Sequence, residues 1–372
     1  MDSIETKSVE TDFTETDSIE IGLITCSPHE EIYSLYGHTA IRCHNLKTGA
    51  DCVYNYGVFN FKAPHFVARF VFGLTDYELA CYPFPPFCYE YQEWGSQVTE
   101  QVLNLSSEEK RSLLDALAHN ARPENKTYRY NFFYDNCSTR PRNIIEDNLN
   151  GTVIYPQQQG EAPTFREMIH QQTRRHPWAT FGNDILLGIM ADRTTSVREQ
   201  EFMPDRLRRD FATAMVERDG MRTPLVKETR IIVMPGVQVV EQEFPLTPLQ
   251  CALVLLVVTL AVFVYEHLKR KTLYLFDAML MTASGLLGCI LFVMIFSQHP
   301  ATSVNLQILV FNPLALVFLP QVVRKRRTRW FTVSLVCIVA FFIGAFWQDY
   351  AEGMEIVALC LLTRTMRHIH DK

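Results

Sequence analysis

The pattern of apolar and polar positions divides the chain near residue 246. Before that point, short apolar stretches alternate with charged and turn-forming residues, as in a soluble domain. After it, the sequence is mostly apolar and its charges are confined to short connectors. A fifth apolar run, from about 353 to 366, is short and contains Glu355. A helix needs about 20 residues to cross a bilayer. The other apolar runs come close to that length and cover 247–268, 276–297, 304–323 and 330–347.

These runs are apolar on every side and only a few residues separate them, which is not the pattern of helices in a soluble core. They predict an all-α transmembrane bundle of about five helices over residues 246–372. The connectors alternate in charge: Lys269, Arg270 and Lys271 follow the first run, whereas 298–305 has no lysine or arginine. Because basic connectors stay in the cytoplasm, the domain before residue 246 is expected to face outward.

The first half combines strand and helix patterns, which predicts an α+β domain over residues 21–245. Ser106 and Glu109 form a capping box that opens a helix, and 164–216 is mainly helical in pattern. Residues 1–20 are acidic and rich in Ser and Thr, so we expect a disordered tail. Strands are expected at 21–25, 38–43, 52–61, 128–132 and 230–234, the second and third forming an antiparallel hairpin.

One cysteine in this half has the setting of a nucleophile. The strand pattern over 128–132 ends at Asp135 and Asn136, and apolar residues at helical spacing follow. Cys137 is therefore expected at a helix N-terminus, where backbone N–H groups and nearby arginines favour the reactive thiolate. The alternative is an inert, buried cysteine, which is common in folded proteins.

A histidine gives Cys137 a possible partner. His38 opens the predicted strand at 38–43, and a Cys-His pair can attack an ester or amide and form a thioester. A catalytic imidazole needs its second nitrogen held by a polar group. Asn55, on the neighbouring strand of the predicted hairpin, is the candidate, with Tyr56 as the alternative.

Further residues are candidates for oxyanion or substrate binding. The N–H of Cys137 and the side chain of Asn136 are expected to bind the oxyanion. Arg140 and Arg42 are candidates for holding a phosphate or carboxylate, although an ordinary ion pair is the default for each. Tyr36 and Ser138, which flank the two reactive residues, complete the set.

Composition excludes several other functions. The net charge is -6, no basic stripe with interleaved aromatic residues suggests nucleic-acid binding, and no Gly-rich phosphate loop is present. The cysteines have no CxxC pair or zinc-like spacing, so we expect neither a metal nor a cofactor. Cys81 and Cys88 are close enough in sequence to close a small loop by a disulfide. No secretory signal is visible at the start, so the outward topology leads us to expect a leader upstream or one already removed.

Three segments together resemble a known family. They are Gly37-His38-Thr39-Ala40-Ile41-Arg42, Tyr54-Asn55-Tyr56-Gly57 and Asn131-Phe132-Phe133-Tyr134-Asp135-Asn136-Cys137-Ser138-Thr139-Arg140. With the apolar runs that follow, they resemble the Lnb-type lyso-form lipoprotein transacylases. The order of histidine before cysteine also resembles circularly permuted papain-like folds.

The resemblance implies a bacterial cytoplasmic (inner) membrane protein, multi-pass, whose N-terminal domain faces the periplasm or the cell exterior. It implies that a fatty acyl group moves from the diacylglyceryl moiety of a lipoprotein to its N-terminal cysteine amine through a thioester. Lipoproteins and membrane lipid are then the partners, with no nucleic acid. Two alternatives stay open: a thiol hydrolase acting on lipids or peptidoglycan peptides, and a non-enzymatic scaffold or transporter. The sequence does not fix the oligomeric state.

Overall fold

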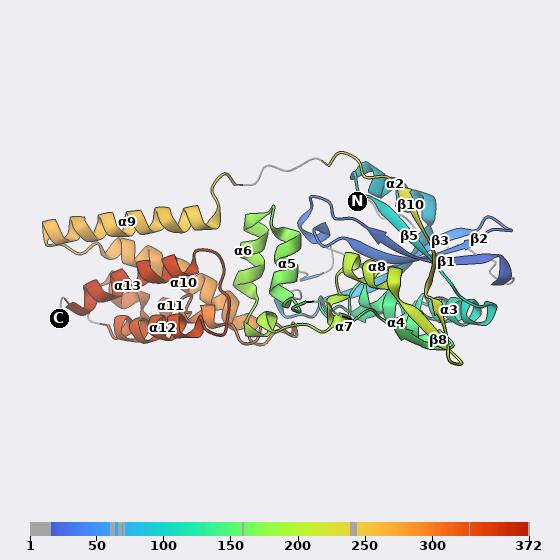
Figure 1. The fold of residues 1–372 in the computed structure, drawn as a ribbon. Helices are drawn as coiled ribbons and strands as arrows, with labels where there is room; N and C mark the ends of the chain where they lie inside the picture. Colours follow the sequence, from blue (N-terminus) through green and yellow to red (C-terminus); the bar gives the residue numbers. More distant parts are fainter. Residues whose placement is uncertain are drawn as a thin grey trace. The chain divides into compact units, whose positions relative to one another are not determined.

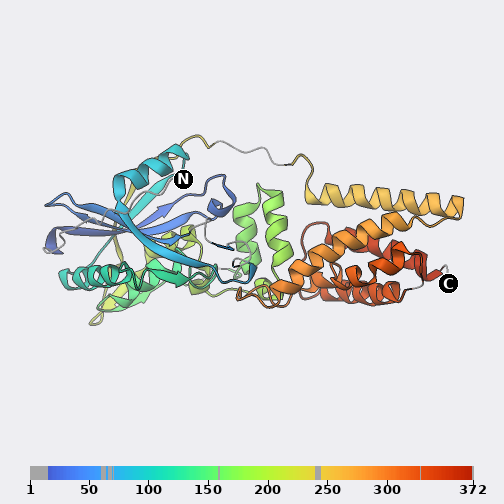
Figure 2. The ribbon, with the colours of Figure 1, turned by 180° about the vertical axis from the view of Figure 1, so that it is seen from behind.

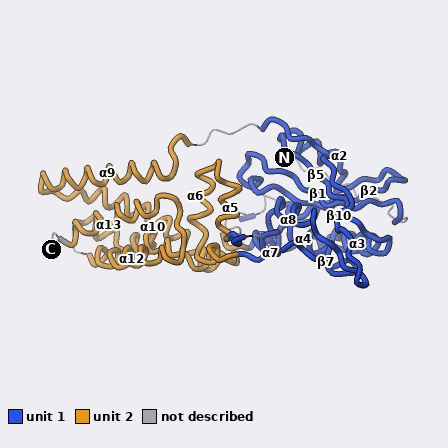
Figure 3. The backbone as a smooth tube through the Cα atoms, viewed as in Figure 1, with its two compact units in different colours: residues 1–70, 74–163, 195–241 blue, residues 71–73, 164–194, 242–372 orange. Residues whose placement is uncertain are grey.

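The computed structural model describes residues 16–59, 64–65, 69, 71–157, 160–238, 244–326 and 328–370. The chain forms two compact units, coloured separately in Figure 3. Unit 1 consists of residues 1–70, 74–163 and 195–241, and unit 2 of 71–73, 164–194 and 242–372. The segment 164–194 thus belongs to the same unit as the apolar helices, although it precedes them in sequence.

Unit 1 is built around a seven-stranded antiparallel sheet with the order β10-β5-β1-β2-β3-β4-β6. A smaller sheet has the order β7-β8-β9. The strands of the large sheet are β1 (Ile19–Cys26), β2 (His38–Asn45), β3 (Asp51–Val58), β4 (Asp76–Pro83), β5 (Val98–Leu103), β6 (Thr127–Arg129) and β10 (Val226–Val233). Those of the small sheet are β7 (Thr152–Ile154), β8 (Met215–Arg218) and β9 (Met221–Pro224).

Helices cover both faces of the large sheet, as the ribbon shows from two sides (Figures 1 and 2). On one face, α2 (Phe84–Glu93) packs its aromatic side chains against Ile24, Ala40 and Val53. On the other face, α3 (Ser107–Asn120), α4 (Thr139–Asp147) and α8 (Pro204–Thr213) pack against the alternate residues of the same strands. The period-2 alternation of the strands therefore builds two apolar cores, one on each side of the sheet.

Several expected elements are present and others differ. The β2–β3 hairpin forms, and the capping box at Ser106 opens α3. The predicted tail at 1–20 lies outside the described residues up to position 15, but Thr16–Ser18 is a short 3-10 helix and β1 begins at Ile19, which is fully buried. The strand expected over 128–132 is shorter, because β6 ends at Arg129 and the chain then turns. Cys81 and Cys88 are both free thiols, with no disulfide between them.

Unit 2 is helical. Two stretches begin it, α5 (Phe165–Thr173) and α6 (Pro177–Leu186). Three described helical stretches are long and apolar enough to cross a membrane: α9 (Pro248–Lys269), α10 (Tyr274–Met294), and 306–323, which ends in α11 (Leu314–Val323). A fourth apolar helix, α12 (Trp330–Gly344), is shorter, and α13 (Met354–His370) follows it.

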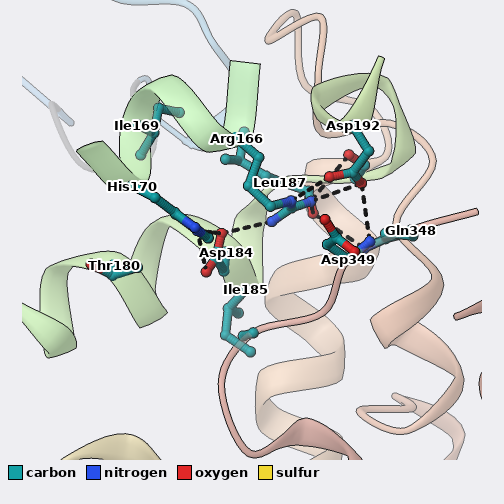
Figure 4. Close-up of polar contacts among 12 residues, drawn as sticks. Arg166, Ile169, His170, Thr180, Asp184, Ile185, Leu187, Asp192, Gln348 and Asp349 are labelled. Carbon is teal, nitrogen blue, oxygen red and sulfur yellow. Dashed lines mark hydrogen bonds and ion pairs between the residues drawn. The ribbon is translucent and has the colours of Figure 1, made fainter. Parts of the chain in front are cut away.

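A buried polar cluster holds α5 and α6 within unit 2 (Figure 4). The Arg166 guanidinium donates to Asp184 at 2.7 Å and to Asp192 at 2.5 Å, and His170 contacts Asp184 at 2.9 Å. Asp192 also accepts the backbone N–H of Asp349, which lies between α12 and α13. The charge of the buried Arg166 is thus compensated within 164–194, and the contact of Asp192 with Asp349 joins that segment to the connection between α12 and α13.

A second ion cluster joins three helices of unit 2. The Arg364 guanidinium of α13 pairs with Glu266 near the end of α9 and with Asp277 in the first turn of α10, each at 2.7 Å. All three side chains are buried. The C-terminal ends of α9 and α13 and the start of α10 therefore lie together.

Candidate active site

His38 and Asn55 lie on the face of the sheet that α2 covers. His38 is the first residue of β2 and Asn55 lies on β3. The Nε2 atom of His38 hydrogen-bonds the Asn55 side-chain oxygen, and the amide nitrogen of Asn55 donates to the Tyr82 hydroxyl on β4. The Tyr82 contact fixes the orientation of the amide, so that its oxygen faces the imidazole. Nδ1 is then the ring nitrogen left to face Cys137.

Cys137 lies in a tight turn before α4. The Asn136 side-chain oxygen accepts the N–H groups of Ser138 and Thr139 at 2.8 and 2.9 Å, which caps the start of the helix. Its amide nitrogen donates to the carbonyl oxygens of Phe132 and Phe202 at 2.9 and 2.8 Å. Asn136 thus fixes the turn that contains Cys137 through four side-chain hydrogen bonds. Both of its amide hydrogens are engaged, so Asn136 does not fit the oxyanion role expected for it.

Gly57 lets Cys137 approach the sheet. The ladder between β3 and β4 is irregular between Asn55 and Val58, and Gly57 has a φ of +91°. A Cβ atom at this position would lie 3.2 Å from the Cβ of Cys137 and 3.9 Å from Cε1 of His38. The bulge and the missing side chain therefore leave the space in which the thiol and the imidazole meet.

The Cys137 thiol and the His38 imidazole both lie next to Gly57 and act on each other electrostatically. Burial raises the pKa of the Cys137 thiol, but the charge of His38, the hydrogen bond from its ring and the N–H groups of Thr39 and Cys137 outweigh burial, and the net pKa is lowered. Burial conversely lowers the pKa of His38, but Cys137 and the hydrogen bond that the ring donates to the Asn55 oxygen raise it above its usual value. Both shifts favour a thiolate beside an imidazolium. Cys137 as a residue is partly exposed.

The two candidate arginines are engaged in ion pairs. Arg42 pairs with Asp51 at 2.6 Å and with Glu100 at 2.9 Å. Arg140 makes a two-pronged contact with Asp135, at 2.6 and 2.8 Å, and its guanidinium stacks over the Tyr128 ring. Each arginine therefore makes an ion pair within the fold, which agrees with the default interpretation of both residues.

Arg140 also lines a groove of about 570 Å³ in unit 1. Cys137 and His38 are not among the residues that line it, so this groove is distinct from the reactive pair. The other residues that line it are Tyr56, Ala116, His119, Asn120, Tyr134, Asp135, Asn143, Ile144, Asp147 and Asn148.

The remaining candidates lie around the pair without joining it. The Ser138 hydroxyl is buried against that of Thr39 at 2.9 Å, which ties α4 to β2. The Tyr36 ring packs edge-on against Phe132 at 4.9 Å. The Tyr56 hydroxyl accepts a hydrogen bond from Asn120 on α3, so Tyr56 faces the other side of the sheet from Asn55.

Three contributors had no role in the sequence-based analysis. Tyr82 orients Asn55, the Thr39 N–H supports the thiolate, and the Phe202 carbonyl anchors Asn136. The sequence around these three residues carries no local signal of their roles. Gly57, in Tyr54-Asn55-Tyr56-Gly57, does carry one, because a glycine within a strand often marks a bulge. Among the described residues, no group of three or more His, Cys, Asp or Glu side chains has the arrangement of a metal site.

Comparison with known families gives two matches. A model described as the Lnb N-terminal periplasmic domain matches residues 5–171, and one described as the Lnb transmembrane domain matches residues 239–372. The first range contains His38, Asn55 and Cys137, and the second contains the apolar helices. No curated protein and no solved structure gave a match.

Proposed function

The chain belongs to the Lnb family, since both domains of that architecture occur along it in order, and from this premise we propose that it is a cysteine-dependent acyltransferase of bacterial lipoproteins. In this proposal the enzyme moves a fatty acyl group from the diacylglyceryl moiety of a lipoprotein to the amine of its N-terminal cysteine. The observation that carries the proposal is that Cys137 and His38 meet next to Gly57, with the His38 ring held by a hydrogen bond to Asn55.

In the first half of the reaction, the Cys137 thiolate attacks the ester carbonyl of the diacylglyceryl group. The backbone N–H groups of Thr39 and Cys137 lower the pKa of the Cys137 thiol and are our candidates to stabilise the oxyanion that forms beside it. The carbon–oxygen bond of the ester then breaks, and His38 gives its proton to the departing glyceryl oxygen. The result is a thioester on Cys137, a neutral His38 and a lyso-lipoprotein.

In the second half, the amine of the N-terminal cysteine attacks the thioester. A carbon–nitrogen bond forms, the carbon–sulfur bond breaks, and His38 takes a proton from the nitrogen. The amide leaves, and the thiolate–imidazolium pair is restored. Asn55 holds the imidazole in one orientation through both steps.

The fold supports a permuted papain-like arrangement as part of this proposal. The strands that carry His38 and Asn55 precede the helix that follows Cys137. We also propose that α13 is a fifth membrane span, which the contacts of Arg364 with α9 and α10 support. Glu355 lies in the first turn of α13, and a helix N-terminus tolerates an acidic side chain. The inner membrane of a bacterium, with unit 1 on the periplasmic side, is the location we propose.

Product analysis tests the proposal. Purified enzyme in detergent is given a synthetic diacylglyceryl-cysteinyl peptide with a free amine, and products are identified by mass spectrometry. We expect an N-acylated lyso-peptide from the native enzyme and none from Cys137→Ser or His38→Ala, although both variants accumulate in the membrane. Free fatty acid as the only product would support a hydrolase instead. Unchanged N-acylation by Cys137→Ser would overturn the proposed chemistry.

A further inference from the structure

The C-terminal half of α2 runs beside His38. At the start of this helix, Phe84 lies under the Arg42 guanidinium at 4.0 Å. Near its end, Tyr91 packs in the same buried cluster as Cys26, which is directly opposite His38 in the β1–β2 ladder. The helix therefore follows β2 from Arg42 back towards His38. Glu90 precedes Tyr91 on this last turn and lies on the face of the sheet that carries His38 and Asn55.

Glu90 has an unusual environment for a carboxylate. It is half-buried, and the groups within its electrostatic reach are His38, Tyr33 and Tyr82. Within the described part of the chain, no arginine or lysine pairs with it and no side chain donates a hydrogen bond to it. Burial raises the pKa of Glu90, while the charge of His38 opposes that shift. Among the described residues, this partly desolvated acid has His38 as its cationic neighbour, and a carboxylate in such surroundings is suited to binding a further cation.

The second half of the proposed reaction needs such a group. The incoming N-terminal amine is mostly an ammonium at neutral pH, and conversion to an amide removes two of its protons. His38 accepts one of them when the thiolate–imidazolium pair is restored. The other proton needs a separate acceptor, because a neutral imidazole takes up only one.

We propose that Glu90 binds the primary ammonium of the acceptor and accepts its first proton. This inference rests on the proposed function. The Glu90 carboxylate takes one proton from the ammonium, and the resulting amine attacks the thioester on Cys137. His38 takes the second proton as the carbon–sulfur bond breaks, and Glu90 then releases its proton to water. Glu90 thus selects an amine over water as the acceptor, and its carboxylate takes up no proton while the thioester forms.

Two matched substrates separate the two halves of the reaction. A diacylglyceryl-cysteinyl peptide with an acetylated amine can only donate its acyl group, whereas the same peptide with a free amine can donate and accept. Glu90→Gln keeps the size of the side chain and removes its charge. We expect this variant to form the Cys137 thioester from the acetylated peptide at the native rate. N-acylation of the free-amine peptide should fall roughly 10²-fold, the scale of one acid–base group.

Two further variants serve as controls. Glu93→Gln removes an exposed carboxylate from the same helix and should change neither rate, whereas Glu90→Asp should retain part of the N-acylation. The inference is overturned if Glu90→Gln N-acylates at the native rate, or if it slows both halves equally, since the residue would then act on His38. Absence of any thioester on the native enzyme would instead count against the proposed function itself.

Discussion

At the scale of single residues, the reactivity of Cys137 depends on neighbours that are distant in sequence. His38 supplies the positive charge, Asn55 holds the ring, and Tyr82 holds Asn55. This chain runs across β2, β3 and β4, so its geometry depends on the register of the sheet. The thiolate–imidazolium form is therefore a property of the folded domain and is not expected of the same residues in an unfolded chain.

The pH dependence of acyl transfer should follow the ionisation of Cys137 and His38. Activity should rise with pH as Cys137 ionises, at a pH below the usual range of a thiol, and fall as His38 deprotonates, at a pH above the usual range of histidine. Because the hydrogen bond that His38 donates to the Asn55 oxygen raises the pKa of His38, Asn55→Ala should move the alkaline limb to lower pH. The maximal rate should fall roughly 10²-fold through misplacement of the ring. A pH–rate profile of both proteins checks this, and an alkaline limb that does not move would argue against the role of Asn55.

At the scale of elements, the bulge in β3 decides whether the nucleophile reaches the sheet. In Gly57→Ala, the new methyl group would meet Cys137 at 3.2 Å on a backbone with φ of +91°. We expect the free energy of unfolding to fall by about 1–2 kcal/mol from the backbone conformation. Acyl transfer should fall by roughly 10²-fold because the thiol is displaced.

Gly49→Ala is the matched control for this prediction. Gly49 has a similar φ of +75°, but nothing lies within 4 Å of a Cβ atom there. This variant should show a comparable stability loss in thermal unfolding with native activity. Equal activity in the two variants would show that contact with Cys137 is unimportant.

Elements with strong local signals were predictable from the sequence. The capping boxes, the β2–β3 hairpin and the apolar helices all depend on residues close together in the chain. β5 gave no such signal, because Thr99, Glu100 and Gln101 are polar yet buried. Glu100 is compensated by Arg42, and Gln101 donates to the carbonyl of Arg208. A local sequence pattern does not indicate hydrogen-bond or ion-pair partners that lie so far away in the chain.

The same limit applies to the candidate site. His38 was paired with Cys137 because it opens a predicted strand and a Cys-His pair is a known nucleophilic arrangement, and Asn55 followed from the expected hairpin. Asn136 was assigned to the oxyanion because it precedes the nucleophile, but its amide is used by the carbonyls of Phe132 and Phe202. The Phe202 partner is 66 positions away, so only the tertiary structure shows that the Asn136 amide is already hydrogen-bonded.

At the scale of the whole molecule, the Arg364 cluster should stabilise the helical unit. Arg364→Leu removes the guanidinium shared by the buried Glu266 and Asp277 and leaves only Arg367 beside the first and His368 beside the second. The loss of one partner from a buried ion pair typically costs about 3–5 kcal/mol. We expect a lower unfolding temperature in detergent and reduced accumulation in the membrane. Arg326→Leu, which removes an exposed arginine from the connector after α11, is the control. Equal stability of the two variants would contradict the role of the cluster.

The measurement that tests the central claim most directly is the identification of the covalent intermediate. Enzyme incubated with the acetylated diacylglyceryl-cysteinyl peptide is quenched in acid, digested and analysed by mass spectrometry. We predict a fatty acyl group on the peptide that contains Cys137, removed by hydroxylamine as a thioester would be, and absent from His38→Ala. An acyl group on another residue, or N-acylated product from the free-amine peptide without any acylated Cys137, would contradict the account.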